Sequence, residues 1–189
     1  MTSIDVELRR TRYDHPDSSR LIDEVQAEYV IRYGGPDSAP VDPDEFAAPR
    51  GTFVVGYVAG VPVTMGGWRR HGAEHSDTGW AGRVAEIKRM YVAPAGRGHG
   101  YARRVLTYLE EAAAAAELDW LVLETGYKQP EAIALYRSSG YVDIPPFGHY
   151  AEAELSVHLG KPVSVNAPKP PPVPPSVASV QETSTQRRP

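Results

Sequence analysis

Hydrophobic and polar positions follow two periodicities along the chain, and their order predicts a mixed α/β fold. Residues 5–11 alternate between polar and apolar side chains, which is typical of a strand. Residues 20–33 carry apolar side chains at helical spacing, which predicts a helix with Ser18 or Ser19 as its N-terminal cap. Residues 34–51 are rich in Pro and Gly and predict a long loop with at most one helical turn.

The later segments continue the alternation of strands and helices. They are expected to be two strands within 52–70 with a turn at Ala59-Gly60, a strand over 83–93, a helix from about Gly98, an apolar strand over 119–126, a short helix over 130–140, and closing strands over 141–146 and 154–160. The order β-α-β-β-β-α-β-α-β-β predicts a single α/β domain around one mixed sheet. Helices must cover both of its faces, because the strand over 119–126 is apolar on both sides.

Composition narrows the possible functions. A chain of 189 residues with a net charge of -4 fits one domain and argues against a nucleic-acid partner, which would require a basic face. The absence of Cys excludes disulfides, thiolate metal sites and a thiol nucleophile. The first residues resemble no secretory signal and no segment is long enough to cross a membrane, so a cytoplasmic location is expected.

The composition changes near the C-terminus, where proline becomes frequent. We therefore expect a folded domain over residues 1–163 and a disordered, Pro-rich tail with polyproline character over residues 164–189. The tail contains PxxP spacings, so it is either a solvated segment or a ligand for an SH3-like partner.

A glycine-rich loop joins the strand over 83–93 to the following helix. Gly96, Gly98 and Gly100 allow close backbone approach, and a helix N-terminus presents unpaired N–H groups, so the loop is a candidate phosphate cradle. Arg97 adds positive charge. The spacing does not give GxGxxG in register, and no Gly-Lys-Ser/Thr follows, so neither a dinucleotide fingerprint nor a P-loop is present. The alternative is a turn that only opens a helix.

Two segments resemble the GNAT superfamily of N-acetyltransferases. Arg97, Gly100 and Ala102 match its Arg/Gln-x-x-Gly-x-Gly/Ala signature. The segment "ETGYKQPEAIALYRSSGY" is similar to the family's later N-x-x-A-x-x-L-Y-x-x-x-G-F/Y motif, with Gln129 in the place of the Asn. The resemblance extends over roughly Val6 to Lys161, and "AEIKRMYV" resembles the family's central strand.

The resemblance implies the fold and the co-substrate. It implies a single domain with a mixed central sheet, helices on both faces and a splayed strand pair that holds acetyl-CoA. The implied co-substrate contacts are the strand backbone and the signature loop, together with one residue before the last helix: Met90, Tyr91, Val92, Arg97, Gly98, His99, Gly100, Tyr101, Ala102 and Gln129. An amide at Met90 or Val92 is the implied donor to the carbonyl oxygen.

Acetyl transfer to an amine requires a base and a proton donor for the leaving thiolate. Glu86 resembles the base of some family members, and we expect partial burial in its apolar strand to raise its pKa towards neutral. The resemblance places the Tyr136 hydroxyl near the sulfur of the co-substrate, as the general acid. The structural alternatives are a solvent-facing Glu86 and a core Tyr136.

The sequence contains fewer indications of the site that binds the amine acceptor than of the co-substrate site. Tyr29 and Tyr33, with Tyr150 from the loop over 144–150, are expected to wall the acceptor pocket. His71 and His75 are spaced i,i+4 in a polar loop without further ligands, so no metal site is expected.

The sequence therefore predicts an acetyl-CoA-dependent N-acetyltransferase that acts by direct transfer on a primary amine, either a small molecule or a protein lysine. A homodimer is an expectation from the family alone. The alternative is an inactive CoA-binding module recruited through its Pro-rich tail.

Overall fold

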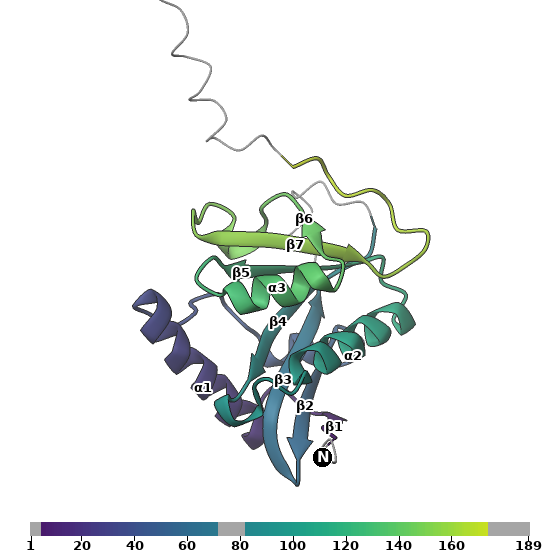
Figure 1. The fold of residues 1–189 in the computed structure, drawn as a ribbon. Coiled ribbons are helices and arrows are strands. Elements are labelled where there is room, and N and C mark those ends of the chain that lie inside the picture. Colours follow the sequence, from purple (N-terminus) through teal and green to yellow (C-terminus); the bar gives the residue numbers. More distant parts are fainter. Residues whose placement is uncertain (1–4, 72–81, 174–189) are drawn as a thin grey trace, which may run out of the picture.

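The computed structural model describes residues 5–71 and 82–173 and contains one seven-stranded sheet with helices on both faces (Figure 1). The strands are β1 (Glu7–Arg10), β2 (Gly51–Val58), β3 (Val61–Arg70), β4 (Val84–Val92), β5 (Trp120–Gly126), β6 (Val142–Asp143) and β7 (Ser156–Pro162). The helices are α1 (Pro16–Tyr33), α2 (Tyr101–Ala115) and α3 (Pro130–Ser138). Short 3₁₀ turns occupy Pro43–Phe46, Pro94–Gly96 and Gly148–Tyr150. The predicted fold class is confirmed.

Two hydrophobic clusters lie on opposite faces of the sheet. One packs α1 against β2, β3 and β4 and contains Leu21, Val25, Phe53, Met65 and Tyr91. The other packs α2 and α3 against alternate residues of the same strands and contains Val54, Ile87, Val105, Leu109 and Tyr136. Because side chains alternate along a strand, β2, β3 and β4 each contribute to both clusters. β5 contributes to the second cluster and, on its other face, to a third cluster that contains Trp120 and Val122, so it is apolar on both sides.

The predicted cap of the first helix is wrong. The helix begins at Pro16, and His15 is its N-cap, with the His15 side chain accepting a hydrogen bond from the Asp17 N–H. Proline is favoured in the first turn of a helix because its missing N–H would be unpaired there. Ser18 lies inside the helix, where its buried hydroxyl donates to the Arg12 carbonyl.

The sheet order is β1-β2-β3-β4-β5-β7-β6, and the β4–β5 pair is parallel. This pairing joins only Val84, Ala85 and Glu86 of β4 to Trp120, Leu121 and Val122 of β5. Beyond these residues β4 runs on to Val92 and β5 to Gly126, and the two strands separate (Figure 1). The splayed strand pair expected from the resemblance is therefore present.

A bulge in β4 accompanies the separation. Gly67 of β3 lies opposite Lys88, and Met65 lies opposite Tyr91, so β4 has one more residue than β3 over this stretch. Arg89 lies in this stretch with φ of 58°, a left-handed conformation that is costly for a residue with a side chain. An extra residue bends a strand and increases its twist, so the bulge turns β4 away from β5.

The start of the Pro-rich segment contacts the domain. The Trp120 indole N–H donates to the Pro168 carbonyl at 2.8 Å, and Ala167 packs on a cluster that includes Trp120 and Phe147. Residues 174–189, which form most of the predicted tail, lie outside the described residues. None of the described helices is long and apolar enough to cross a membrane.

At Gly67, β3 packs closely against the rings of Phe46 and Phe53. We therefore predict that Gly67→Ala destabilises the protein. A Cβ at Gly67 would lie 2.5 Å from the Phe53 ring and 2.7 Å from the Thr52 carbonyl oxygen, which is backbone and cannot move freely. Overpacking of this kind costs about 1–3 kcal/mol, measurable by denaturant unfolding. The matched control is Gly35→Ala, where a Cβ meets no atom within 4 Å. An equal free energy of unfolding for the two variants would contradict this packing.

Candidate active site

Two cavities meet where β4 and β5 separate. The larger has a volume of about 870 Å³ and the smaller about 350 Å³. Both are lined by the same five residues at their junction, which come from α1, β4, and α3 with its N-cap: Tyr29, Met90, Gln129, Ala132 and Tyr136. A molecule in one cavity can therefore contact a molecule in the other at this junction.

The larger cavity runs from the junction to the N-terminus of α2. Its walls include all but one of the residues that the sequence assigned to the co-substrate: Met90, Tyr91, Val92, Arg97, Gly98, Gly100, Tyr101, Ala102 and Gln129. The exception is His99, whose exposed ring stacks on Tyr101 and whose Nδ1 lies 2.8 Å from the Arg97 carbonyl oxygen. The cofactor role of His99 stays a prediction.

The glycine loop has the geometry of an anion cradle. Gly98 and Gly100 have φ of 77° and 78°, and Gly100 is the N-cap of α2. A Cβ at Gly100 would meet no protein atom within 4 Å, so the space over this helix N-terminus is open. The unpaired N–H groups of the first turn and the helix dipole favour a negatively charged group there.

Two arginines at this cavity are held by partners on β4, α1 and the end of α3. Arg97 donates to the Val92 carbonyl and forms an ion pair with Glu28 of α1. Arg103 of α2 donates to the hydroxyls of Ser138 and Ser139 at the end of α3. The arginine side chains thus connect the helices across the cavity.

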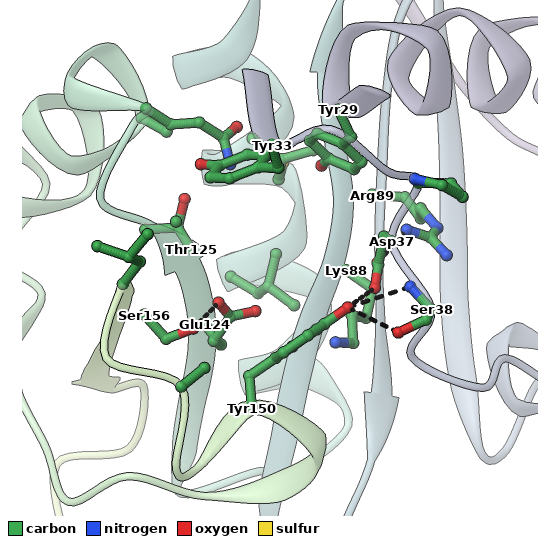
Figure 2. A pocket seen from close by; sticks show the side chains of 18 of the residues that line it. Tyr29, Tyr33, Asp37, Ser38, Lys88, Arg89, Glu124, Thr125, Tyr150 and Ser156 are labelled. Carbon is green, nitrogen blue, oxygen red and sulfur yellow. Dashed lines mark hydrogen bonds and ion pairs between the residues drawn. The ribbon is translucent and has the colours of Figure 1, made fainter. Parts of the chain in front are cut away.

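The smaller cavity is walled by three tyrosines that the sequence assigned to the acceptor. Tyr29 and Tyr33 project from α1, and Tyr150 projects from the loop before β7 (Figure 2). The Tyr150 hydroxyl donates to Asp37 at 2.6 Å and accepts from the Ser38 N–H at 3.1 Å. These bonds connect the loop after α1 to the loop before β7, so the cavity wall combines segments that lie 113 residues apart.

Arg89 connects that wall to the β4 bulge. Its guanidinium is buried, forms an ion pair with Asp37 and donates to the Tyr13 hydroxyl at 3.2 Å. Burial opposes the charge of Arg89, but the hydrogen bond and charges of its partners raise its pKa, so it stays a cation. The ion pair and the hydrogen bond of the Arg89 side chain therefore offset the cost of its left-handed backbone conformation, and they hold Asp37 in place.

Tyr136 lies at the junction of the two cavities. Its side chain is almost fully buried, and its ring packs edge-on against Tyr141 with centroids 5.6 Å apart. Burial raises the pKa of Tyr136, so the hydroxyl keeps its proton at physiological pH and is available as a hydrogen-bond donor. The ring is a core aromatic and the residue also lines both cavities, so the two alternatives considered from the sequence are compatible.

The expectation that burial raises the pKa of Glu86 towards neutral is wrong. Glu86 is only 4% exposed, and burial alone would raise its pKa. However, Lys88 lies 2.9 Å from one carboxylate oxygen and Arg69 lies 3.1 Å from the other, and together these cations lower the pKa. Glu86 is absent from the described walls of both cavities. Its role as base stays a prediction.

A second carboxylate, Glu124 of β5, lines the smaller cavity and was not among the sequence candidates. Burial raises its pKa, and the Ser156 hydroxyl, which donates to it at 2.7 Å, lowers it in part. In the sequence, the feature that could have identified Glu124 is an acidic residue in an otherwise apolar strand. That signal does not reveal which face of the strand is open, because this depends on where β4 leaves β5.

Of the two histidines spaced i,i+4 in the sequence, His71 lies within the described residues. No group of three potential metal ligands is present in the described parts of the chain. His71 packs edge-on against Phe147 at 5.3 Å, and His75 lies outside the described residues.

A family profile and a curated relative agree on the family of this chain. The profile of the acetyltransferase (GNAT) family matches residues 18–141. A curated relative, "IAA acetyltransferase" from Azospirillum brasilense, is 37% identical over 76% of this chain and 89% of its own length.

Solved structures agree with this family. An acyl-CoA N-acyltransferase, as it is described, from Klebsiella pneumoniae has a TM-score of 0.66 at 25% identity, and the match covers 84% of this chain and 98% of that one. A Salmonella typhimurium protein described as an acetyltransferase, yncA, solved with acetyl-CoA, has a TM-score of 0.60 at 16% identity, covering 87% and 98%. The latter match shows a shared fold.

The pairing of Glu86 predicts a pH-dependent loss of stability in Glu86→Gln. A carboxylate whose folded-state pKa is lowered stabilises the protein above its unfolded pKa of about 4.3, and this contribution disappears as the pH falls through the folded-state pKa. At pH 7 the variant leaves Arg69 and Lys88 without their shared anion, which costs on the order of 3 kcal/mol. Unfolding measured at pH 7 and below pH 4 should show the difference narrowing in acid.

The matched control for this measurement is Glu7→Gln. Glu7 also pairs with an arginine, Arg9, but its side chain is 63% exposed, so its replacement should leave stability nearly unchanged. A Glu86→Gln variant as stable as this control at pH 7 would refute the buried pairing.

Proposed function

The chain belongs to the acetyltransferase (GNAT) family, and from this we propose that it transfers the acetyl group of acetyl-CoA directly to a primary amine. The observation that carries the proposal is the meeting of two cavities at Met90 and Tyr136. Direct transfer requires both substrates in one site with their reacting atoms in contact. The absence of Cys supports the direct route, because no acyl-cysteine intermediate can form.

The larger cavity fits acetyl-CoA. We assign the pyrophosphate to the N-terminus of α2, because Gly98 and Gly100 leave open space over the unpaired N–H groups there and Arg97 adds a cation. We assign the pantetheine arm to the backbone of Met90, Tyr91 and Val92, which β5 leaves unpaired. When bound, acetyl-CoA supplies an activated thioester.

The residues at the junction would then assist the transfer of the acetyl group. A backbone N–H of Met90 or Val92 would donate to the carbonyl oxygen as negative charge develops on it. The Tyr136 hydroxyl would donate to the leaving sulfur, and its raised pKa keeps it protonated until that moment. Gln129 lines both cavities and lies where it can contact either substrate.

The basic test of this function is the release of the free thiol of CoA from acetyl-CoA in the presence of a panel of primary amines, with the acetylated amine identified by mass spectrometry. The proposal expects amine-dependent release. Binding of CoA without turnover of any amine would instead support an inactive CoA-binding module.

Gly100→Val is predicted to weaken the binding of CoA by tenfold or more, about 1.4 kcal/mol. The valine would fill the open space over the helix N-terminus, and it would also be strained at φ of 78°. Isothermal titration calorimetry with CoA gives the affinity.

Gly60→Val is the matched control for this variant. Gly60 has the same φ of 78° and open surroundings, but it lies in the β2–β3 turn, away from both cavities. If both variants bind CoA as the wild type does, the loop is not the pyrophosphate site.

Tyr136→Phe is predicted to lower kcat by about a hundredfold while leaving the affinity for CoA nearly unchanged, because only the proton donor is lost. The control is Tyr141→Phe, which removes a neighbouring buried hydroxyl that lines neither cavity. Steady-state kinetics with one amine separate the two. A kcat for Tyr136→Phe equal to that of Tyr141→Phe would make Tyr136 purely structural.

A further inference from the structure

The charged side chains around the smaller cavity form ion pairs, with the exception of one carboxylate. Four of them line the cavity: Asp37, Lys88, Arg89 and Glu124. Asp37 pairs with Arg89, as described above. Lys88 belongs to a second group, in which Glu86 contacts both Lys88 and Arg69, and Arg69 also contacts Glu45.

These two groups are neutral overall. Asp37, Glu45 and Glu86 supply three negative charges, and Arg69, Lys88 and Arg89 supply three positive ones. The cations are also shielded from solvent, since the side chains of Lys88 and Arg89 are only 10% and 5% exposed. The described part of the cavity wall therefore offers no cation that lacks an anion of its own.

Glu124 is the carboxylate that forms no ion pair of its own within the described residues. Lys88 also faces it, but the Lys88 ammonium is paired with Glu86. Across residues 5–71 and 82–173, the hydrogen bonds and ion pairs of its side chain comprise the single bond from the neutral Ser156 hydroxyl to one oxygen. Figure 2 shows the carboxylate in the middle of the cavity, with Tyr29 and Tyr33 on one side and Tyr150 on another. On the adjacent strand β7, His158 is the residue paired with Glu124. His158 is buried, and burial lowers its pKa, so its ring is neutral at pH 7 and supplies no charge.

The surroundings of Glu124 suit a small cation. The electron-rich faces of aromatic rings attract a cation brought close to them. A cavity of about 350 Å³ lies at the lower end of the range for small-molecule sites. One buried negative charge is best neutralised by one positive charge, because a partly desolvated ion without a partner is costly.

We propose that Glu124 binds the ammonium group of the acceptor, and that the acceptor is a small primary amine with a single positive charge and no carboxylate. This inference rests on the proposed function and names the substrate class of the same site. A zwitterionic amino acid would bring its own carboxylate into a cavity whose cations are already paired, and that second negative charge would stay uncompensated.

The same position makes Glu124 the acceptor of the amine's proton. The ammonium nitrogen loses two protons during the reaction, one to the Glu124 carboxylate and one that ends on the sulfur as the N–C bond forms and the C–S bond breaks. Glu124 then releases its proton to solvent. The charged and titratable groups facing it are Glu86 and Lys88 from β4, Asp37 from the loop after α1, His158 from β7, and three tyrosines, Tyr29, Tyr33 and Tyr136.

Matched pairs of amines that differ only in the carboxylate give the first test. Tyramine and tyrosine form one pair, and phenethylamine and phenylalanine form another. We expect kcat/KM for each decarboxylated amine to exceed that of its amino acid by about tenfold to a hundredfold, the usual range for a charged hydrogen-bonded contact. Equal values, or a preference for the amino acids, would overturn the inference and leave the proposed function intact.

Glu124→Gln gives the second test, because the amide keeps the size of the side chain and can still accept the Ser156 hydrogen bond. We expect KM for tyramine to rise about tenfold or more, kcat to fall most near neutral pH and least at alkaline pH, and KM for acetyl-CoA to stay unchanged. The matched control is Glu152→Gln, an exposed carboxylate in the loop before β7 that lines neither cavity. Wild-type values of all three parameters in Glu124→Gln would overturn the inference.

Binding separates a failure of this inference from a failure of the proposed function. If no amine is acetylated at all, the proposed function fails, and calorimetric titration of tyramine and tyrosine into the wild type and Glu124→Gln still decides the role of Glu124. Tighter binding of tyramine than of tyrosine, lost in Glu124→Gln, supports the site. Equal binding of the two ligands by both proteins overturns it.

Discussion

The separation of β4 from β5 after three paired residues is the constraint on which the site depends. In a continuous parallel sheet the β4 backbone beyond Glu86 would be hydrogen-bonded to β5, and neither cavity would exist. The bulge at Arg89 turns the strand, and the exposed backbone must then be covered by something other than a strand. The larger cavity lies along that backbone and ends at the N-terminus of α2. The smaller cavity opens on the other side of Met90 and Tyr136.

Ion pairs hold this separated region in place. Arg89 is strained at its backbone, and its side chain is fixed by Tyr13 and Asp37, so the bulge and the loop after α1 stabilise one another. Tyr150 extends the same network to the loop before β7. On β4 itself, Glu86 connects Lys88 to Arg69 of β3. Glu86 therefore has the environment of a structural anion, whereas Glu124 forms no ion pair within the described residues and lines the smaller cavity.

The sequence predicted the parts of the site that depend on local pattern. The glycines that precede α2 and the helix that carries Tyr136 follow from short-range chemistry and from the resemblance, and both line the cavities. The sequence did not predict the pairing of Asp37 with Arg89 and Tyr150, because these residues come from three distant segments. The role of Glu124 was hidden for a similar reason, since the open face of β5 is defined by the departure of β4. The pKa of Glu86 is lowered rather than raised because Lys88 contacts its carboxylate from the same strand and Arg69 reaches it from the adjacent strand.

The central claim is that an acetyl group passes directly between the two cavities to an amine. It is tested most directly by incubating the protein with acetyl-CoA that carries an isotope-labelled acetyl group, together with tyramine, and following the label by mass spectrometry. The account predicts that the label appears on the amine nitrogen of the acceptor, while the intact protein keeps its unlabelled mass throughout turnover. Label that accumulates on the protein before it reaches the amine, or that never reaches any amine although CoA binds, would contradict the account.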